Sequence, residues 1–177
     1  LGNVSCAMTT HLRLILASSL IALITAGCGK KDTSSTSTTE ATTATAPTPT
    51  GPRTVEITAG DTMKFSTTSI EAKPGEQLTV ILTNTGSQPK EVMWHNWILL
   101  KMGTDAEAFD KAGAQATTSE YFPTALADQV ITHIPLLGPR KSGQVTFTVP
   151  TAPGEYPFLC SFPAHFQAGM KGVLVVK

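Results

Sequence analysis

The sequence predicts an all-β fold, a β-sandwich with one short helical insertion, in the part of the chain that begins at Arg53. Three observations support this prediction. Short segments alternate between apolar and polar residues, turn signals with glycine or proline separate them, and a single stretch has the composition of a helix. Many short strands with one helical insertion are typical of two sheets packed face to face.

The expected elements follow in chain order. Val55 and Ile57 alternate with polar neighbours and predict a first strand. Further strands are expected at Leu78–Thr83, Val145–Val149 and Gly172–Val176, and the run Glu91–Leu99 is also strand-like. The helix is expected over residues 105–115, DAEAFDKAGAQ, with Thr104 or Asp105 as its N-cap. The turn signals are Lys73-Pro74-Gly75, Thr85-Gly86-Ser87, Pro139-Arg140 and Ala152-Pro153-Gly154.

Residues 1–27 have the pattern of a bacterial lipoprotein signal peptide. Arg13 precedes a mostly apolar stretch of a length that suits a signal sequence, and the small residues Ala26 and Gly27 stand directly before Cys28. Cleavage before Cys28 would leave its thiol free to carry lipid. An ordinary signal peptide or an uncleaved apolar anchor is the alternative. We therefore expect an extracytoplasmic protein, anchored by lipid to a bacterial membrane at its periplasmic face or the cell surface.

The next segment, residues 28–52, is expected to be the lipidated cysteine and a disordered linker rich in Thr, Ser and Pro. It has no large apolar residue, so it cannot bury enough surface to offset the entropy of ordering. The folded domain is expected at residues 53–177. Of the three cysteines only Cys160 falls in this domain, so a disulfide framework is not expected. Thirteen basic residues balance thirteen acidic ones without a basic stripe, which argues against a nucleic-acid partner.

Three potential metal ligands near the C-terminus, Cys160, His165 and Met170, follow one another at steps of five residues. Thiolate and thioether suit Cu(I), and imidazole serves both oxidation states of copper. A trigonal site with a long axial methionine needs a second histidine. His11 belongs to the signal peptide, which leaves His95 and His133. We interpret His133 as a structural or surface residue, because no thiol or carboxylate motif surrounds it.

The segments MWHNWILL, around His95, and CSFPAHFQAGMKG, from Cys160, resemble the azurin and auracyanin branch of the cupredoxins. The resemblance covers residues 53–177 and implies a Greek-key sandwich. It implies that one copper ion is held by His95, Cys160, His165 and Met170. It also implies that Asn96 braces the cysteine loop and that Trp97 is a buried core residue. Backbone N–H groups near Asn96 and Phe162 are candidates for hydrogen bonds to the thiolate.

The sequence departs from azurins in three ways. Four residues separate His165 from Met170, as in auracyanin and plastocyanin, where azurins have three. Trp94 stands where azurins carry a glycine whose carbonyl is a weak fifth contact to copper, so the Trp94 carbonyl is a candidate for that contact. The azurin disulfide is missing, since Val55 and Gly75 occupy the matching region.

The resemblance implies a type 1 blue copper protein that carries single electrons and is not an enzyme, because protein ligands fill the metal site. Its expected partners are c-type cytochromes or membrane oxidoreductases, which it would bind transiently. The protein itself is expected to be a monomer. The surface expected to dock them is apolar and consists of Met93, Leu137, Phe162, Pro163, Ala164 and Phe166.

Two other functions are weighed against this interpretation. A copper-trafficking or storage protein would favour Cu(I) and often has Met-rich segments, which this chain lacks. An enzyme of the nitrite reductase kind would need a second copper bound by histidines, and one spare histidine cannot supply that site.

Overall fold

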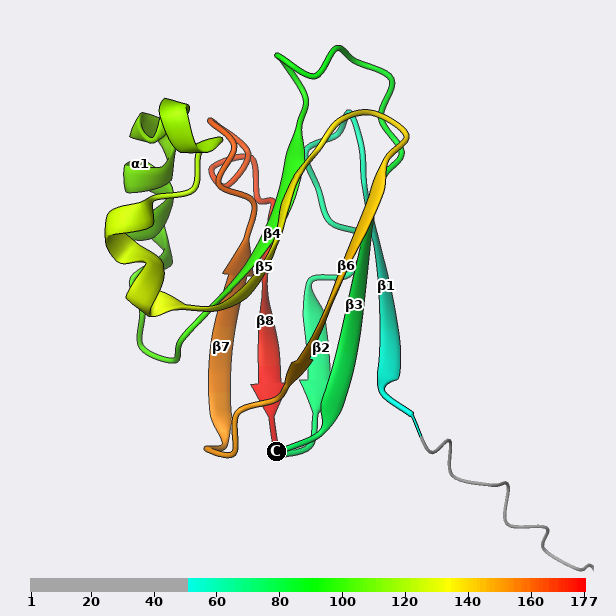
Figure 1. Cartoon of the computed structure of the whole chain (residues 1–177), viewed down its shortest axis with the longest axis vertical. Coiled ribbons are helices and arrows are strands. Elements are labelled where there is room, and N and C mark those ends of the chain that lie inside the picture. Colours follow the sequence, from blue (N-terminus) through cyan, green and yellow to red (C-terminus); the bar gives the residue numbers. More distant parts are fainter. Residues whose placement is uncertain (1–50) are drawn as a thin grey trace, which may run out of the picture. The chain divides into compact units, whose positions relative to one another are not determined.

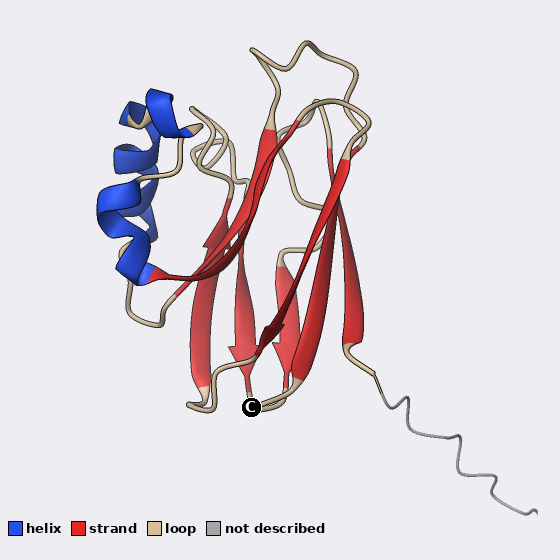
Figure 2. Cartoon of the chain, in the orientation of Figure 1, coloured by secondary structure: helices blue, strands red, loops and turns tan. Residues whose placement is uncertain are grey.

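The computed structural model of the chain describes residues 51–177, which form two β-sheets and one helical segment (Figure 1 and Figure 2). One sheet has three strands in the order β1-β3-β6, and the other has five in the order β2-β8-β7-β4-β5. The prediction of an all-β sandwich is confirmed. In chain order the strands are β1 Arg53–Ala59, β2 Ser69–Ala72, β3 Gln77–Asn84, β4 His95–Leu100, β5 Val130–Leu137, β6 Ser142–Thr148, β7 Gly154–Leu159 and β8 Lys171–Val176.

The chain crosses between the two sheets. β1 and β3 are parallel neighbours in one sheet, whereas β2, which lies between them in the sequence, pairs in parallel with β8 in the other. The remaining strand pairs are antiparallel. Such crossings are typical of Greek-key sandwiches. As a result β4 and β7 lie side by side, although two strands and the helical segment separate them in the sequence.

The helical segment covers one side of the five-stranded sheet (Figure 2). It begins with α1, Ala106–Gln115, whose N-cap is Asp105, one of the two caps that the sequence left open. The Asp105 carboxylate accepts hydrogen bonds from the backbone N–H groups of Glu107 and Ala108, both at 3.0 Å. Two short 3₁₀ helices follow, η1 Thr117–Ser119 and η2 Thr124–Gln129, which the sequence did not predict.

The predicted strands correspond to β1, β3, β6 and β8, and the strand-like run around His95 contains most of β4, while β2, β5 and β7 were not predicted. Pro135 lies in β5 and Pro157 in β7, and a proline within an apolar run argues against a strand because it cannot donate a ladder hydrogen bond. β5 tolerates its proline because it is the edge strand of its sheet.

The core lies between the sheets, and β4 is buried on both of its faces. Trp97 and Leu99 of β4 pack into the main core against residues such as Leu78 and Phe158. The alternate residues Ile98 and Leu100 pack into a second cluster under α1. This double cover explains why residues 97–100, WILL, form an apolar run instead of alternating with polar residues.

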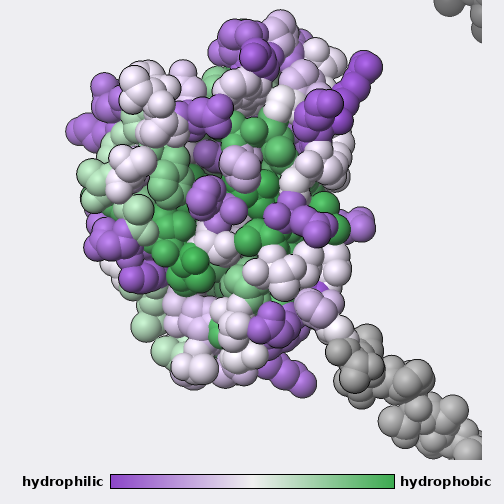
Figure 3. Space-filling model, viewed as in Figure 1, coloured by the Kyte–Doolittle hydropathy of each residue, from purple (hydrophilic) through white to green (hydrophobic). Residues whose placement is uncertain are grey.

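The molecular surface is mostly polar. On the face shown in Figure 3, apolar residues are visible in the area between α1 and β6. The half-buried Ile131, Leu136 and Leu137 of β5 pack against the main core. None of the helices within residues 51–177 is long and apolar enough to cross a membrane.

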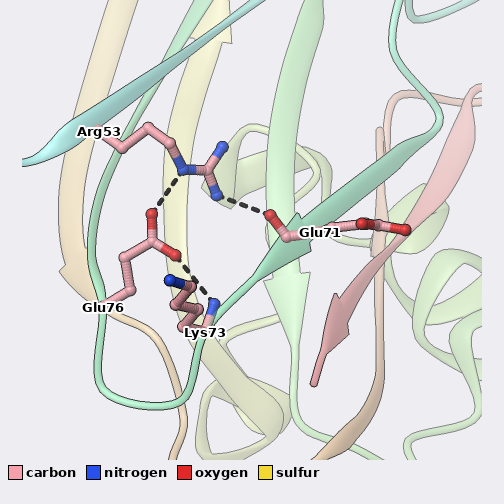
Figure 4. A network of polar contacts seen from close by, with 4 residues as sticks. All are labelled: Arg53, Glu71, Lys73 and Glu76. Atoms are coloured by element: carbon pink, nitrogen blue, oxygen red, sulfur yellow. Dashed lines mark hydrogen bonds and ion pairs between the residues drawn. The ribbon is translucent and has the colours of Figure 1, made fainter. Parts of the chain in front are cut away.

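A polar network links the start of β1 to the turn between β2 and β3 (Figure 4). Arg53 Nε donates to Glu76 Oε1 at 2.5 Å, and its Nη2 donates to the Glu71 carbonyl at 2.6 Å. Glu76 Oε2 accepts from the backbone N–H of Lys73 at 2.9 Å. The Arg53 side chain lowers the pKa of Glu76, and the Lys73 amide adds to the effect. Because Arg53 is exposed, we assign this network to fixing the first strand and not to a large share of stability.

Leu99 is fully buried, so Leu99→Ala should lower the free energy of unfolding by about 3 kcal/mol. The substitution removes buried apolar contacts and leaves a cavity. The matched control is Val92→Ala, since Val92 is 57% exposed, and its effect should stay within about 0.5 kcal/mol. Urea unfolding monitored by tryptophan fluorescence measures both. Equal losses in the two variants would contradict this description of the core.

Candidate metal centre

The centre forms where β4 begins and β7 ends. These strands are antiparallel neighbours, with Ile98 opposite Leu159, so the residues at the start of β4 run alongside the residues that follow β7. His95 is the first residue of β4, and Cys160 directly follows β7. Sheet pairing therefore brings together two side chains that are far apart in the sequence.

His95, Cys160 and His165 make a buried cluster. One potential ligand atom from each lies within 4.8 Å of the other two. Cys160 Sγ is 3.5 Å from His165 Nδ1, and the centroids of the two imidazole rings are 4.9 Å apart. Each of the three residues is at most 1% exposed. Among residues 51–177 this is the single group of histidine, cysteine or acidic side chains that meets the criterion for a metal site. His133 lies outside it.

The loop from Cys160 to Met170 is held by its own backbone hydrogen bonds. The amide of Cys160 donates to the Met170 carbonyl at 3.1 Å, and the amide of Met170 donates to the His165 carbonyl at 2.9 Å. The amide of His165 donates to the Phe162 carbonyl at 3.1 Å. Ala164 has a φ of 69°, the left-handed conformation needed for this tight turn. These bonds place the fully buried Met170 directly beside Cys160 and His165.

A second set of hydrogen bonds joins the cysteine loop to β4 and to the helical segment. The Asn96 side chain donates to Ser161 Oγ and accepts from the Ser161 amide, both at 2.9 Å. Ser161 Oγ donates to the Tyr121 carbonyl at 2.6 Å. Tyr121 and its neighbour Glu120 both have positive φ, a conformation that costs free energy in residues other than glycine. The sequence predicted a bracing role for Asn96 but gave no sign of the link to Tyr121.

Burial sets the protonation of the cluster. It lowers the pKa of His95 to about 4 and that of His165 to about 4, so both imidazoles are neutral at pH 7. Burial also raises the pKa of the Cys160 thiol to about 12, although backbone N–H groups of Asn96 and Phe162 face the sulfur and act in the opposite direction. Without a metal the sulfur therefore keeps its proton.

The donor set fits a metal ion. Neither ring nitrogen of the fully buried His95 has a hydrogen-bond partner of acceptable geometry, a costly arrangement unless something else binds there. Neutral imidazoles are ready to coordinate, and a metal ion can replace the thiol proton of Cys160. Two imidazoles, a thiolate and a nearby thioether form a combination that suits copper.

The other predicted residues divide into two groups. Met93, Leu137 and Pro163 are half-buried, Ala164 is exposed, and the ring of the buried Phe162 lies 4.8 Å from that of His165. Phe166 instead packs into the cluster under α1, with Lys171 Nζ 4.0 Å from its ring centroid. The solvent-exposed part of the predicted docking surface is therefore smaller than expected, because Phe162 and Phe166 are buried.

Trp94 and His133 lie outside the cluster. The half-buried Trp94 has Lys90 Nζ 5.3 Å from its ring, and its Nε1 has no hydrogen-bond partner. Within residues 51–177, Trp94 forms no aromatic pair with Phe162 or Phe166 of the Cys160–Met170 loop. His133 is exposed on β5 and stacks with Phe122 at 4.6 Å.

Comparison with known proteins gives consistent matches. Residues 53–177 match the family of copper-binding proteins of the plastocyanin/azurin type. The chain is 41% identical over 123 residues to azurin from Bordetella pertussis, which covers 68% of this chain and 81% of that protein. It is 35% identical over 126 residues to auracyanin-B from Chloroflexus aurantiacus, covering 70% of this chain and 52% of that protein.

Solved structures agree. A reduced auracyanin from Roseiflexus castenholzii superimposes with a TM-score of 0.63 at 35% identity, covering 72% of this chain and 99% of that one. An azurin from Methylomonas sp. strain J superimposes with a TM-score of 0.62 at 32% identity, covering 72% of this chain and 99% of that one.

The metal-free protein should lose stability as the pH falls from about 6.5 to about 4. In this window the unfolded chain binds protons on His95 and His165 that the folded chain does not bind, so stability is complete above pH 6.5 and declines below it. The loss should reach about 3 kcal/mol for each histidine. Urea unfolding of the metal-free protein across this pH range measures it. His133→Gln, which leaves the cluster intact, should keep most of the dependence, and a constant stability would contradict the burial of neutral imidazoles.

Proposed function

Because the chain belongs to the plastocyanin/azurin family of copper-binding proteins, we propose that it is a membrane-anchored type 1 blue copper protein that shuttles single electrons between extracytoplasmic redox partners. The observation that carries the proposal is the buried cluster of His95, Cys160 and His165. We assign these three side chains as equatorial ligands of one copper ion and Met170 as the axial ligand. The Trp94 carbonyl is a candidate for a weak fifth contact.

Copper bound there would gain and lose one electron, between Cu(II) and Cu(I). The protein contributes a binding site whose parts are already in place. Backbone bonds within the loop hold Cys160 and His165, and the Asn96–Ser161 bonds hold the loop against β4. A site that does not need to rearrange lets the electron move with little reorganisation. The amides of Asn96 and Phe162, which face the sulfur, would tune the potential.

Electron exchange also needs a short path to a partner. The buried His165 directly follows the exposed Ala164 in the loop, which makes it the candidate ligand for such a path. Pro163, Met93 and Leu137 are half-buried and apolar. We assign these residues to the docking surface. An apolar surface without strong charge suits brief, weak contact with a c-type cytochrome or a membrane oxidoreductase.

An electron carrier agrees better with the site than an enzyme or a copper-storage protein. The protein ligands are buried and linked to one another, so they offer no open position for a substrate. Burial also slows the exchange of metal that a trafficking protein needs. Azurin and auracyanin, the relatives of this chain, are electron-transfer proteins. A reversible blue colour with fast electron exchange distinguishes a carrier from a storage protein.

The membrane anchor is proposed from the sequence, since the signal at 1–27, Cys28 and all of the linker at 28–52 except residues 51 and 52 lie outside the residues that the structure describes. The small residues before Cys28 support lipidation at its thiol. The linker would allow the folded part to reach a partner away from the bilayer.

The copper ligands can be tested by absorption. Cu(II)-loaded protein should show an intense thiolate-to-copper charge-transfer band, and Cys160→Ser should abolish it because a hydroxyl cannot supply the donor orbital. His95→Gln should weaken or shift the band strongly. The control His133→Gln, exposed on β5, should keep the wild-type spectrum. A Cys160→Ser protein that is as blue as wild type, or a His133→Gln protein that is colourless, would refute the ligand assignment.

The anchor can be tested by fractionation of cells that produce the full chain. The wild-type protein should sediment with membranes. Cys28→Ala should carry no lipid, because alanine has no thiol to attach it. If the signal is that of a lipoprotein, the Cys28→Ala protein is either released from the membrane or keeps its uncleaved signal peptide. The mass of the protein distinguishes these two outcomes. Labelling with a radioactive fatty acid should mark wild type alone. Label retained in Cys28→Ala would contradict lipidation at Cys28.

A further inference from the structure

Asp110 is a buried carboxyl group that the ligand set does not use. It lies on α1 and is 2% exposed. Gln167 Nε2 donates a hydrogen bond to its Oδ2 at 2.6 Å, whereas Oδ1 has no partner. A buried carboxyl with one unpartnered oxygen is costly and needs an explanation.

The helix face that carries Asp110 packs on the loop that carries the ligands. Phe109, Asp110 and Gly113 are the buried residues of α1. A Cβ at Gly113 would lie 3.0 Å from the Cβ of Ser161, so the helix approaches the residue next to Cys160 closely. Gln167 lies two residues after His165. Asp110 is therefore buried beside the backbone of the metal loop, and Figure 1 shows α1 next to the loop between β7 and β8.

The charges around Asp110 come from three elements. Burial raises its pKa, the Gln167 hydrogen bond and Lys171 of β8 lower it, and Glu107 on the same helix raises it. Asp110 in turn raises the pKa of Cys160, which shows that the carboxylate and the sulfur influence each other. Gln167 is itself exposed, so solvent lies only one side chain away from the carboxyl group.

We propose that Asp110 is a redox-linked proton site, which takes up a proton from solvent when the centre gains an electron. The proposal rests on the electron-transfer function proposed above. In the balanced step the redox partner supplies one electron, which converts Cu(II) to Cu(I). Solvent supplies one proton, which converts the Asp110 carboxylate to the carboxylic acid. The centre and its surroundings then keep their total charge. Oxidation returns the electron to a partner and the proton to solvent.

The direction of the effect follows from electrostatics. The reduced centre carries one positive charge less, so a nearby carboxylate is less favoured and binds its proton at a higher pH. The reduction potential must therefore fall as the pH rises through the range in which Asp110 loses its proton. Below that range a neutral Asp110 leaves the potential high, and above it a permanent negative charge keeps the potential low.

Other groups near the site are less suited to this role. Asp61 is exposed, and its hydrogen bonds from Ser87 lower its pKa, so it stays charged throughout. Asn84 is buried near the site and donates to the carbonyls of Met93 and Leu137, but an amide does not titrate. His133 lies outside the cluster on β5.

The test compares the reduction potentials of the copper protein and of Asp110→Asn by redox titration of the blue band, from about pH 4, near the ordinary pKa of an aspartate, to about pH 8. Asparagine keeps the shape and can still accept from Gln167, but it has no charge. At about pH 8, the upper end of this range, Asp110→Asn should have a higher reduction potential than wild type. As the pH falls the difference should close, because wild-type Asp110 becomes neutral too. Comparing the difference between the curves cancels the contribution of all other groups.

Glu155→Gln is the matched control, since it removes an exposed carboxylate on β7 that does not shift the pKa of Asp110. Its curve should run parallel to that of wild type. A constant difference between wild type and Asp110→Asn would show a fixed charge and overturn the proposal. Coincident curves would show no coupling and overturn it as well. A wild-type protein with no reversible blue band would refute the electron-transfer function first, so the two failures are distinguishable.

A second variant covers the case in which Asp110→Asn does not fold. Gln167→Leu removes the hydrogen bond that favours the carboxylate, so Asp110 should bind its proton at a higher pH. The fall in potential should then move to higher pH in Gln167→Leu. An unchanged curve in this variant would overturn the proposal.

Discussion

The structure depends on one constraint: two neutral imidazoles and a thiol are held together where water does not reach. Taken alone these groups are unfavourable in the interior. Both nitrogens of His95 lack a partner, and the pKa of the Cys160 thiol is raised to about 12 by burial. A bound copper ion would coordinate one nitrogen of each imidazole and replace the thiol proton. The sandwich must therefore supply the free energy that holds the metal-free cluster together, and metal binding in turn stabilises the fold.

The arrangement of strands meets this constraint. The pairing of β4 with β7 places His95 opposite the cysteine loop, and β4 is held rigidly because it is covered on both faces. The Asn96–Ser161–Tyr121 bonds then tie three segments together around the sulfur. The helical segment has two roles in this account. It closes one side of the centre, and it places a titratable carboxyl group, Asp110, against the metal loop.

The sequence predicted the parts of the site that are contiguous and missed those that depend on packing. The steps of five from Cys160 to His165 and Met170 are local, and so is the cap of α1 at Asp105. His95 was chosen over His133 through the resemblance to cupredoxins and because no thiol or carboxylate motif surrounds His133. The burial of Asp110 and the position of Phe166 under α1 depend on how the helix packs, which no local pattern encodes. The strands β5 and β7 were missed because each contains a proline.

The central claim is that the ligands occupy their final positions before the metal binds and keep them through the redox cycle. Crystal structures of the metal-free, Cu(I) and Cu(II) forms test it most directly. The account predicts that His95, Cys160 and His165 coordinate one copper ion and that their side chains superimpose within experimental error in all three forms. A copper ion bound elsewhere, for example at His133, or a reorientation of His95 or His165 between the forms, would contradict it.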